Sequence, residues 1–235
     1  MKHIPFNNRY VSLGETFYVK TSPSPVTKPT LIKFNDELAE ALGLSVTNQN
    51  SSDAAALFSG NLIPDGAEPL AMAYAGHQFG HFNPQLGDGR AILLGEIISP
   101  DGGCFDMQLK GSGRTFYSRD GDGRAALGPV LREYLISEAM VKLSVPTTRA
   151  LAVVTTGEDV ARERLVPGGI ITRIASSFVR VGTFQYFSAK GDMEAIQKLA
   201  DYVIERNYPL VCEAKNPYVA FLQAVVDRQA TLIAQ

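Results

Sequence analysis

The alternation of apolar and polar residues predicts a hairpin of two strands in the middle of the chain. The segments RAILLGEI (residues 90–97) and CFDMQLK (Cys104–Lys110) are short and rich in residues that favour strands, and the turn sequence SPDGG separates them. Similar runs predict further strands at residues 149–156, 169–175 and 178–184. Short turns join antiparallel strands, whereas parallel strands need longer connections. The pattern therefore predicts a twisted, mainly antiparallel sheet.

Capping residues predict two short helices before these strands. Asn35 suits the N-cap of the first, and Gly43 stands just past its end. Ser51 or Ser52 suits the start of the second, which stops near Gly60. Residues 1–30 are predicted to form an extended arm rather than a core element, because proline and hydroxyl residues crowd their second half. Residues 69–82 are apolar and small and match no element firmly.

Three longer helices are predicted after the hairpin. Pro129 suits the first turn of one that runs to Leu143 and packs beside the sheet, and Asp192 and Asn216 are N-caps of two more. The last helix carries an apolar stripe on one face, made of Tyr218, Phe221, Leu222, Val225, Leu232 and Ile233. Such a face must pack on something, so we expect a longer protein and expect this chain to self-associate through the stripe.

Composition and charge narrow the class of protein. The 235 residues are 45% hydrophobic, and the net charge of −2 gives no electrostatic footprint for nucleic acid or an anionic membrane. The cysteines, Cys104 and Cys212, fit neither a disulfide framework nor a metal-ligand spacing. Neither a signal peptide nor a membrane-spanning run is evident, so a cytoplasmic protein is expected.

The pattern Gly-x-Gly-Arg occurs three times, at residues 87–90, 111–114 and 121–124. Nothing else repeats with it, which argues against a solenoid. The first copy precedes a strand and lacks a third glycine, so it is not a dinucleotide fingerprint, and a Walker loop is absent. Glycines would let backbone N–H groups approach phosphate oxygens, and the strand-end Lys110 would add a positive charge. A helical carboxylate, Glu133 or Glu138, could hold that lysine, as in the small lobe of a protein kinase.

Plainer interpretations of the same residues stay open at this point. Lys110 and its carboxylate could form a structural ion pair, and Arg173 and Arg180 could be solvated charges on strands. The DGDG segment at Asp120 resembles a calcium loop, but its twelfth position is Leu131, where glutamate is needed. His77 and His81 would share a face of a helix, although no third zinc ligand accompanies them.

Three longer stretches carry the glycine turns and their surroundings: YAGHQFGHFNPQLGDGRAILLGE, DMQLKGSGRTFYSRDGDGRAALGPVLREYLISEAM and VPTTRALAVVTTGE. They resemble the selenoprotein O family of kinase-like protein adenylyltransferases. The similarity runs from RYVSL to AFLQAVVDRQATLIAQ, nearly the whole chain. It implies an α+β fold with a kinase-like small lobe and an enzyme that binds ATP in a flipped orientation. Such an enzyme transfers AMP to hydroxyl side chains of other proteins.

The same resemblance implies the site residues. Lys110 and Glu133 would form the catalytic pair, and the remaining nucleotide contacts would be Gly87, Gly89, Arg90, Asp122, Gly123, Arg173 and Arg180. The middle turn, GSGR, is expected to contribute least directly. The family's aspartate-asparagine base motif and metal ligands match nothing before Gln235, so the Mg²⁺ or Mn²⁺ site is expected beyond it. The chain is then the amino-terminal half of the enzyme, inactive by itself; the rival is a catalytically inactive pseudokinase or scaffold.

Three regions are expected on this basis. Residues 1–75 would form an N-terminal extension with short helices, and residues 76–190 the kinase-like small lobe with its nucleotide-binding loops. Residues 191–235 would be the helical segment that leads into a large lobe. The expected partners are ATP and the modified proteins, with neither nucleic acid nor membrane among them.

Overall fold

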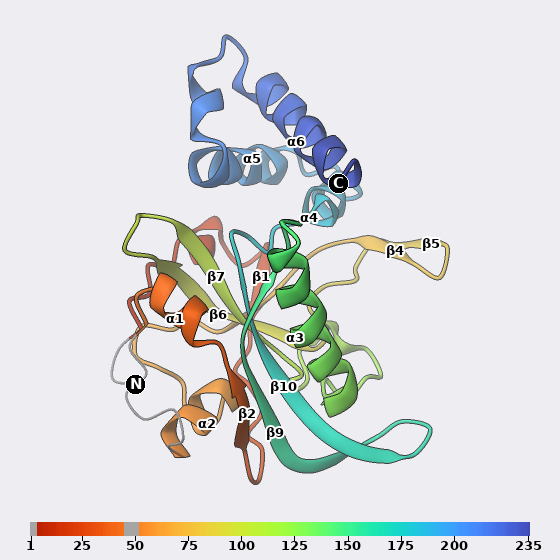
Figure 1. Ribbon diagram of the computed structural model, residues 1–235. Helices are drawn as coiled ribbons and strands as arrows, with labels where there is room; N and C mark the ends of the chain where they lie inside the picture. The colour runs from red at the N-terminus through yellow and green to blue at the C-terminus, as the bar shows by residue number, and fades with distance from the viewer. Residues whose placement is uncertain (1–3, 45–51) are drawn as a thin grey trace.

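An eight-stranded antiparallel sheet runs through the structure, a computed structural model that describes residues 4–44 and 52–235. The strand order is β1-β3-β6-β7-β10-β9-β2, and the short strand β8 pairs with β10. The sheet strands are β1 (Tyr18–Lys20), β2 (Thr30–Phe34), β3 (Leu70–Met72), β6 (Ala91–Ile98), β7 (Cys104–Lys110), β8 (Ala125–Ala126), β9 (Arg149–Ala161) and β10 (Leu165–Ala175). A separate hairpin, β4 (Gly76–Gln78) and β5 (His81–Asn83), projects away from it (Figure 1).

Six α-helices and three 3-10 helices accompany the sheet in the described part of the chain, and the last three α-helices lie together beyond one end of it (Figure 1). The α-helices are α1 (Asp36–Ala41), α2 (Ser52–Ser59), α3 (Leu127–Lys142), α4 (Val181–Ser188), α5 (Met193–Asn207) and α6 (Pro217–Ile233), and the 3-10 helices are η1 (Tyr10–Leu13), η2 (Phe116–Ser118) and η3 (Pro209–Glu213). Together with the sheet they confirm the α+β class.

The central hairpin has the predicted arrangement. Strands β6 and β7 pair antiparallel from Ala91 opposite Lys110 to Ile98 opposite Cys104. Strand β10 then pairs antiparallel with β7, so that Ile171 lies opposite Lys110. The mainly antiparallel sheet is therefore confirmed.

The predicted caps lie at the observed helix ends. Asn35 Oδ1 accepts a hydrogen bond from Leu38 N, and Gly43 follows α1 with a positive φ of 68°. Asp192 and Asn216 cap α5 and α6 in the same way. The predicted cap at Ser51 lies outside the described residues, and Gly60 follows α2 with a φ of 82°.

Two sequence-based predictions are wrong. Residues 1–30 supply strand β1 and fully buried side chains such as Phe17, because β1 pairs with β3 and closes one edge of the sheet. Residues 178–184, predicted as a strand, instead form a loop and the start of α4. The backbone at Gly182 approaches Ala75 so closely that a Cβ would lie 2.0 Å from the Ala75 carbonyl oxygen, and Ala75 N donates to Gly182 O. Glycine alone fits this contact.

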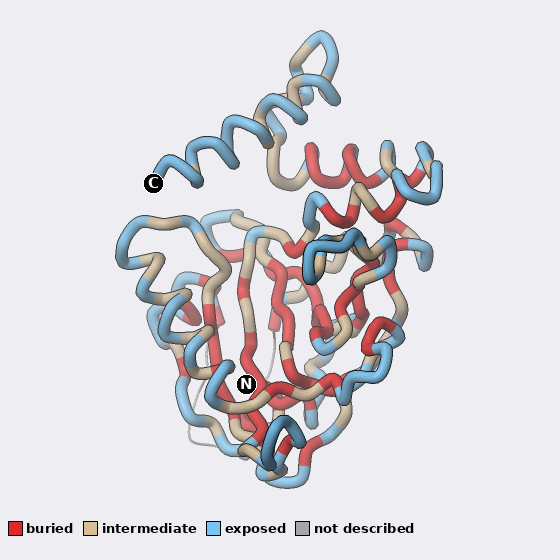
Figure 2. Tube along the Cα trace, turned by 90° about the vertical axis from the view of Figure 1, so that its right-hand side faces the viewer, coloured by how far each residue is buried: buried red, intermediate tan, exposed pale blue. Residues whose placement is uncertain are grey.

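The core divides into three clusters of apolar side chains. Helices α1 and α2 cover one face of the sheet, over residues such as Met107 and Leu109 of β7. Helix α3 covers part of the opposite face, where Val130 packs on Val153 and Ile171. The third cluster joins η1, β1 and β3 to α4 and α5, and Figure 2 shows the buried inner side of α5 beside the exposed α6.

Candidate functional site

Lys110 and Glu133 form an ion pair between the end of β7 and helix α3. Lys110 Nζ lies 2.5 Å from Glu133 Oε2, and both side chains are about three-quarters buried. Glu138 is engaged elsewhere: it accepts hydrogen bonds from Arg149, from Ala150 N and from Asn35. Burial lowers the pKa of Lys110, and the bond to Glu133 partly opposes that shift. The prediction that Lys110 meets Glu133 is confirmed, and its role in catalysis stays a prediction.

Arg173 of β10 lies against the other oxygen of Glu133. Its Nη1 is 3.5 Å from Glu133 Oε1, and its Nη2 donates to Gln108 Oε1. The guanidinium lies 5.0 Å from the centre of the Phe178 ring. Among the described residues, Arg173 Nε is buried without a hydrogen-bond partner. Burial lowers the pKa of Arg173, and the guanidinium is held between a carboxylate, an amide and an aromatic ring.

Arg180, at the start of α4, reaches the buried Asp88 of the first glycine turn. Arg180 Nη2 lies 3.6 Å from Asp88 Oδ1, and the guanidinium stacks 4.4 Å from the centre of the Tyr74 ring. Asp88 Oδ2 accepts from Gln108 Nε2 at 3.0 Å and from Met72 N. Burial raises the pKa of Asp88, although Arg180 and Arg173 oppose that shift. Gln108 therefore bridges Arg173 and Asp88.

Asp88 and Gln108 were not predicted as site residues. Gln108 is fully buried and Asp88 is 2% exposed. A signal was present in the strand segment DMQLK, where polar residues alternate with core residues, which places Gln108 and Lys110 on one face of β7. A buried polar residue needs partners, and this face provides them.

The glycines of the first turn make room for an aromatic side chain. A Cβ on Gly87 would lie 2.1 Å from Cγ of Tyr117, and one on Gly89 would lie 2.8 Å from the Tyr117 carbonyl oxygen. Gly87 also has a φ of 61°. Packing against Tyr117 accounts for both glycines, and their contact with phosphate stays a prediction. The exposed Arg90 lies near enough to Lys110 to help lower its pKa.

The three glycine turns lie against one another. In the middle turn, Gly113 N donates to Gly123 O of the last turn, and a Cβ on Gly123 would lie 2.1 Å from Gly113 C. The middle turn also contacts the first one, because Gly111 N donates to Arg90 O. Thr115 and Ser118 add hydrogen bonds to the carbonyl oxygens of Asp88 and Gly89. The middle turn thus links the other two.

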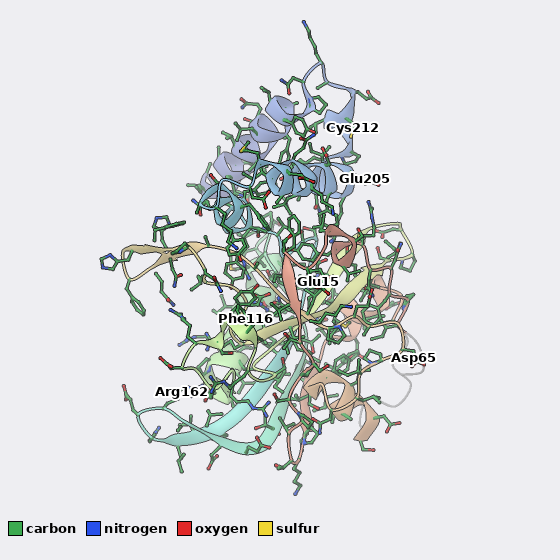
Figure 3. The ribbon with its side chains drawn as sticks, turned by 180° about the vertical axis from the view of Figure 1, so that it is seen from behind. Glu15, Asp65, Phe116, Arg162, Glu205 and Cys212 are labelled. Atoms are coloured by element: carbon green, nitrogen blue, oxygen red, sulfur yellow. The ribbon has the colours of Figure 1, made fainter. Side chains whose placement is uncertain are left out.

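Asp122 has a partner that the sequence did not suggest. Arg162 projects from the β9–β10 hairpin (Figure 3), and its Nη1 lies 2.6 Å from Asp122 Oδ2. This hydrogen bond lowers the pKa of Asp122. The structure therefore joins Lys110, Glu133, Arg173 and Arg180 in one chain of contacts, while Asp122 pairs with the hairpin.

The contact chain carries a surplus of positive charge. In the described part of the chain, Lys110, Arg173 and Arg180 form ion pairs with two carboxylates, Glu133 and Asp88, and Arg90 adds a further cation nearby. Guanidinium and ammonium groups in such a cluster suit a phosphate-bearing ligand. Arg180 also lines a groove of about 1250 Å³ between α4, α6 and the loop after α3. The geometry can bind a polyanion at the edge of this groove.

No metal site accompanies the cluster in residues 4–44 and 52–235, where no group of three or more His, Cys, Asp or Glu side chains could hold an ion. His77 and His81 lie on the paired strands β4 and β5 rather than on a helix, so the premise of the zinc alternative is wrong. None of the helices in these residues has both the length and the hydropathy that crossing a bilayer requires.

Comparisons with known proteins match the whole chain. The family model described as protein adenylyltransferase SelO matches residues 1–235. A protein nucleotidyltransferase YdiU from Rhizobium johnstonii is 61% identical over 98% of this chain and 46% of its own length. Proteins of the same name from Rhodopseudomonas palustris and a Bradyrhizobium species are 58% and 57% identical, each over 99% of this chain and 47% of their own length. The chain spans about half the length of these curated relatives.

Proposed function

The chain belongs to the protein adenylyltransferase SelO family, and we propose that it is the nucleotide-binding part of an enzyme that transfers AMP from ATP to protein hydroxyl groups. The similar proteins are named protein nucleotidyltransferases, which gives the reaction class. The target side chains would be serine, threonine and tyrosine, as the family resemblance implies.

One observation carries the proposal: Lys110 is held by Glu133 beside two arginines. This arrangement has the parts of a kinase-like small lobe, namely an antiparallel sheet, a strand-end lysine and a helix whose carboxylate orients it. We propose that residues 76–190 form this lobe, to which β1, β2 and β3 add strands from residues 1–75. Residues 191–235 would lead toward the large lobe.

The residues of the cluster have distinct proposed tasks. Lys110, Arg173 and Arg180 would bind phosphate oxygens of ATP, and Glu133 would keep the Lys110 ammonium in place. Gly87, Gly89, Arg90, Asp122 and Gly123 are proposed to complete the nucleotide site. Bound Mg²⁺ or Mn²⁺ would neutralise charge on the phosphates, and its ligands are proposed to lie outside this chain. The 235-residue chain alone would then bind nucleotide without transferring AMP.

Substituting Lys110 tests the proposal directly. In the intact protein, Lys110→Ala should abolish transfer of label from α-³²P-ATP to protein while leaving the thermal midpoint within about 2 °C, because it removes charge rather than core volume. Lys142→Ala is a matched control, since Lys142 pairs with Glu37 at the surface of the same helix that carries Glu133. Undiminished labelling by folded Lys110→Ala protein would refute the role of Lys110. ATP binding without transfer by the wild-type intact protein would favour the inactive module.

A further inference from the structure

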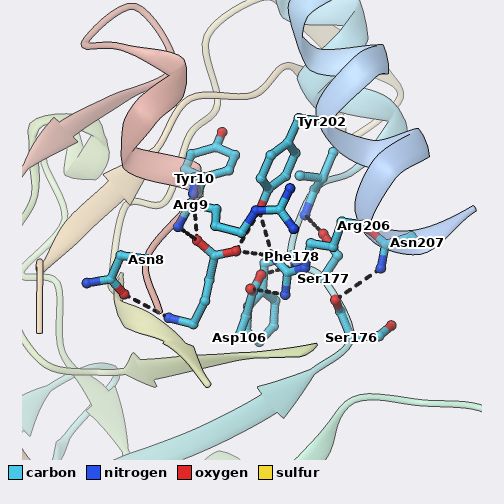
Figure 4. Close-up of polar contacts among 12 residues, drawn as sticks. Asn8, Arg9, Tyr10, Asp106, Ser176, Ser177, Phe178, Tyr202, Arg206 and Asn207 are labelled. Atoms are coloured by element: carbon cyan, nitrogen blue, oxygen red, sulfur yellow. Dashed lines mark hydrogen bonds and ion pairs between the residues drawn. The ribbon is translucent and has the colours of Figure 1, made fainter. Parts of the chain in front are cut away.

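A buried cluster of charges joins α5 to the sheet, behind the candidate site. The guanidinium of Arg206 lies between two carboxylates, 2.7 Å from Glu96 Oε1 and 2.6 Å from Asp106 Oδ1 (Figure 4). The three side chains are between 1% and 3% exposed. The Tyr202 hydroxyl donates a hydrogen bond to Glu96 Oε1 and accepts one from Arg206 Nη1. We call Glu96, Asp106, Tyr202 and Arg206 the α5 cluster.

Stability alone is a poor explanation for the α5 cluster. Two carboxylates face one guanidinium, so the cluster buries net negative charge, which is costly to remove from water. Glu96 offsets part of this cost by accepting from the backbone N–H groups of Arg9 and Tyr10. Apolar residues of similar volume often stabilise a core as well as a buried ion pair does. The segments that the cluster holds in place explain its burial better than stability does.

The α5 cluster holds the loop that carries two residues of the candidate site. Asp106 Oδ2 accepts from Phe178 N at 2.7 Å, and Asn207 donates to Ser176 O (Figure 4). The Phe178 ring in turn lies 5.0 Å from the Arg173 guanidinium. Arg180, at the end of the same loop, contacts Asp88. The loop is thus held by α5 and β7 on one side, and on the other side it contacts Arg173 and Asp88 of the candidate site.

Strand β7 links the two clusters through one face. Asp106, Gln108 and Lys110 alternate with the core residues Met107 and Leu109, so their side chains share a side of the strand. Asp106 contacts the α5 cluster, Gln108 contacts Arg173 and Lys110 contacts Glu133. A rigid strand therefore connects α5 with the residues proposed to bind phosphate.

We propose that Asp106, held by Arg206, is a positioning residue of the nucleotide site, because it fixes Phe178 and thereby orients Arg173. The inference rests on the proposed function, since it takes Arg173 as a phosphate-binding group. Asp106 itself touches no nucleotide. Its effect should therefore appear in how tightly ATP binds more than in how fast bound ATP reacts.

The test measures KM for ATP and kcat for AMP transfer in the intact protein. Asp106→Leu keeps a similar side-chain volume but removes both carboxylate oxygens, which accept from Arg206 and from Phe178 N, and Phe178→Leu removes the ring beside Arg173. Each should raise KM about tenfold, which equals ~1.4 kcal/mol, and leave kcat within about threefold. The double variant should bind ATP no more weakly than either single variant, because both changes break the same connection.

Glu96→Gln is the matched control. It weakens the same buried cluster. Among the described residues, the Glu96 carboxylate accepts from Arg206, Tyr202 and the backbone N–H groups of Arg9 and Tyr10, so the bond from Phe178 to Asp106 stays. We expect a lowered thermal midpoint, with KM near the wild-type value. An equal rise of KM in Glu96→Gln would overturn the inference, since general loosening of α5 would then explain both.

Two further outcomes separate this inference from the proposed function. Unchanged KM in Phe178→Leu, together with weakened binding in Lys110→Ala, would overturn the inference and leave the nucleotide site in place. Unchanged nucleotide binding and transfer in Lys110→Ala would refute the proposed site itself. Phe178→Leu decides between these outcomes even if Asp106→Leu does not fold.

Discussion

Replacing Gly87 by alanine separates two explanations for the first glycine turn. A Cβ at this position would lie 2.1 Å from Cγ and 2.3 Å from Cδ1 of Tyr117, and the backbone φ is +61°. Gly102, in the β6–β7 turn, also has a positive φ of +86°, but a Cβ there would meet nothing within 4 Å. Gly102→Ala therefore reproduces the backbone strain without the collision.

The two substitutions should lower the free energy of unfolding by different amounts, because only Gly87→Ala forces the Tyr117 ring to move. Alanine at a positive φ costs about 1 kcal/mol at either position. Tyr117 is 6% exposed, so its displacement adds an overpacking cost of about 1–3 kcal/mol. We expect Gly102→Ala to lose about 1 kcal/mol and Gly87→Ala about 2–4 kcal/mol. In a chain of this size these losses lower the thermal midpoint by about 3 °C and about 10 °C.

Urea unfolding followed by circular dichroism measures both losses, with ATP titration in parallel. Tyr117→Ala in the Gly87→Ala background should recover part of the collision energy, which a double-mutant cycle quantifies. Equal unfolding midpoints for Gly87→Ala and Gly102→Ala would refute the packing explanation. Equal midpoints with ATP binding lost only in Gly87→Ala would show that this glycine is required by the ligand.

Three other predictions concern pH, an ion pair and association. Burial, opposed by Arg206, raises the pKa of Asp106 to about 6. The folded protein therefore binds this proton more tightly than the unfolded chain does, which adds about 3 kcal/mol to the free energy of unfolding. This stabilisation is complete below about pH 4 and is lost as the pH rises through 6. Urea unfolding at several pH values should show the wild type losing this stability relative to Asp106→Asn as the pH rises. A difference in free energy of unfolding between the two proteins that stays constant with pH would contradict the prediction. Glu138→Gln should lower the free energy of unfolding in urea at pH 7 by about 1–2 kcal/mol and leave the affinity for ATP unchanged, because Glu138 holds Arg149 rather than Lys110. Weaker ATP binding by this variant would show that Glu138 contributes to the nucleotide site. Leu222 is 64% exposed on α6 and should promote self-association of the 235-residue chain. Sedimentation should therefore show fewer oligomers for Leu222→Asp than for the wild type. Equal sedimentation distributions for the two proteins would show that this face of α6 does not mediate association.

Local sequence determined most of the secondary structure. Strand β6 follows from its continuous run of apolar residues and β7 from its alternation, and Asn35, Asp192 and Asn216 cap the helices that they were expected to begin. These signals lie within a few neighbouring residues and act through backbone hydrogen bonds of the same segment. The family resemblance supplied the proposed site residues, which the spacing of glycines and arginines could not have assigned.

Contacts between distant segments decided what the local pattern left open or misrepresented. Residues 178–184 alternate like a strand, but the contact between Gly182 and Ala75 places them at the start of a helix. Glu133 and Glu138 were equal candidates by position, and the structure separates them because Arg149, the first residue of β9, pairs with Glu138.

Nothing in the sequence indicated that the charges of the α5 cluster meet. Arg206 occurs in a helix whose charged residues suggest a solvated face, and it is the fold that brings it between Glu96 and Asp106, about a hundred residues earlier. A charged residue carries no mark of its own burial, because its partners are chosen by packing across the chain. The sequence by itself therefore determined the elements and their caps, and only the tertiary structure decided which charges meet.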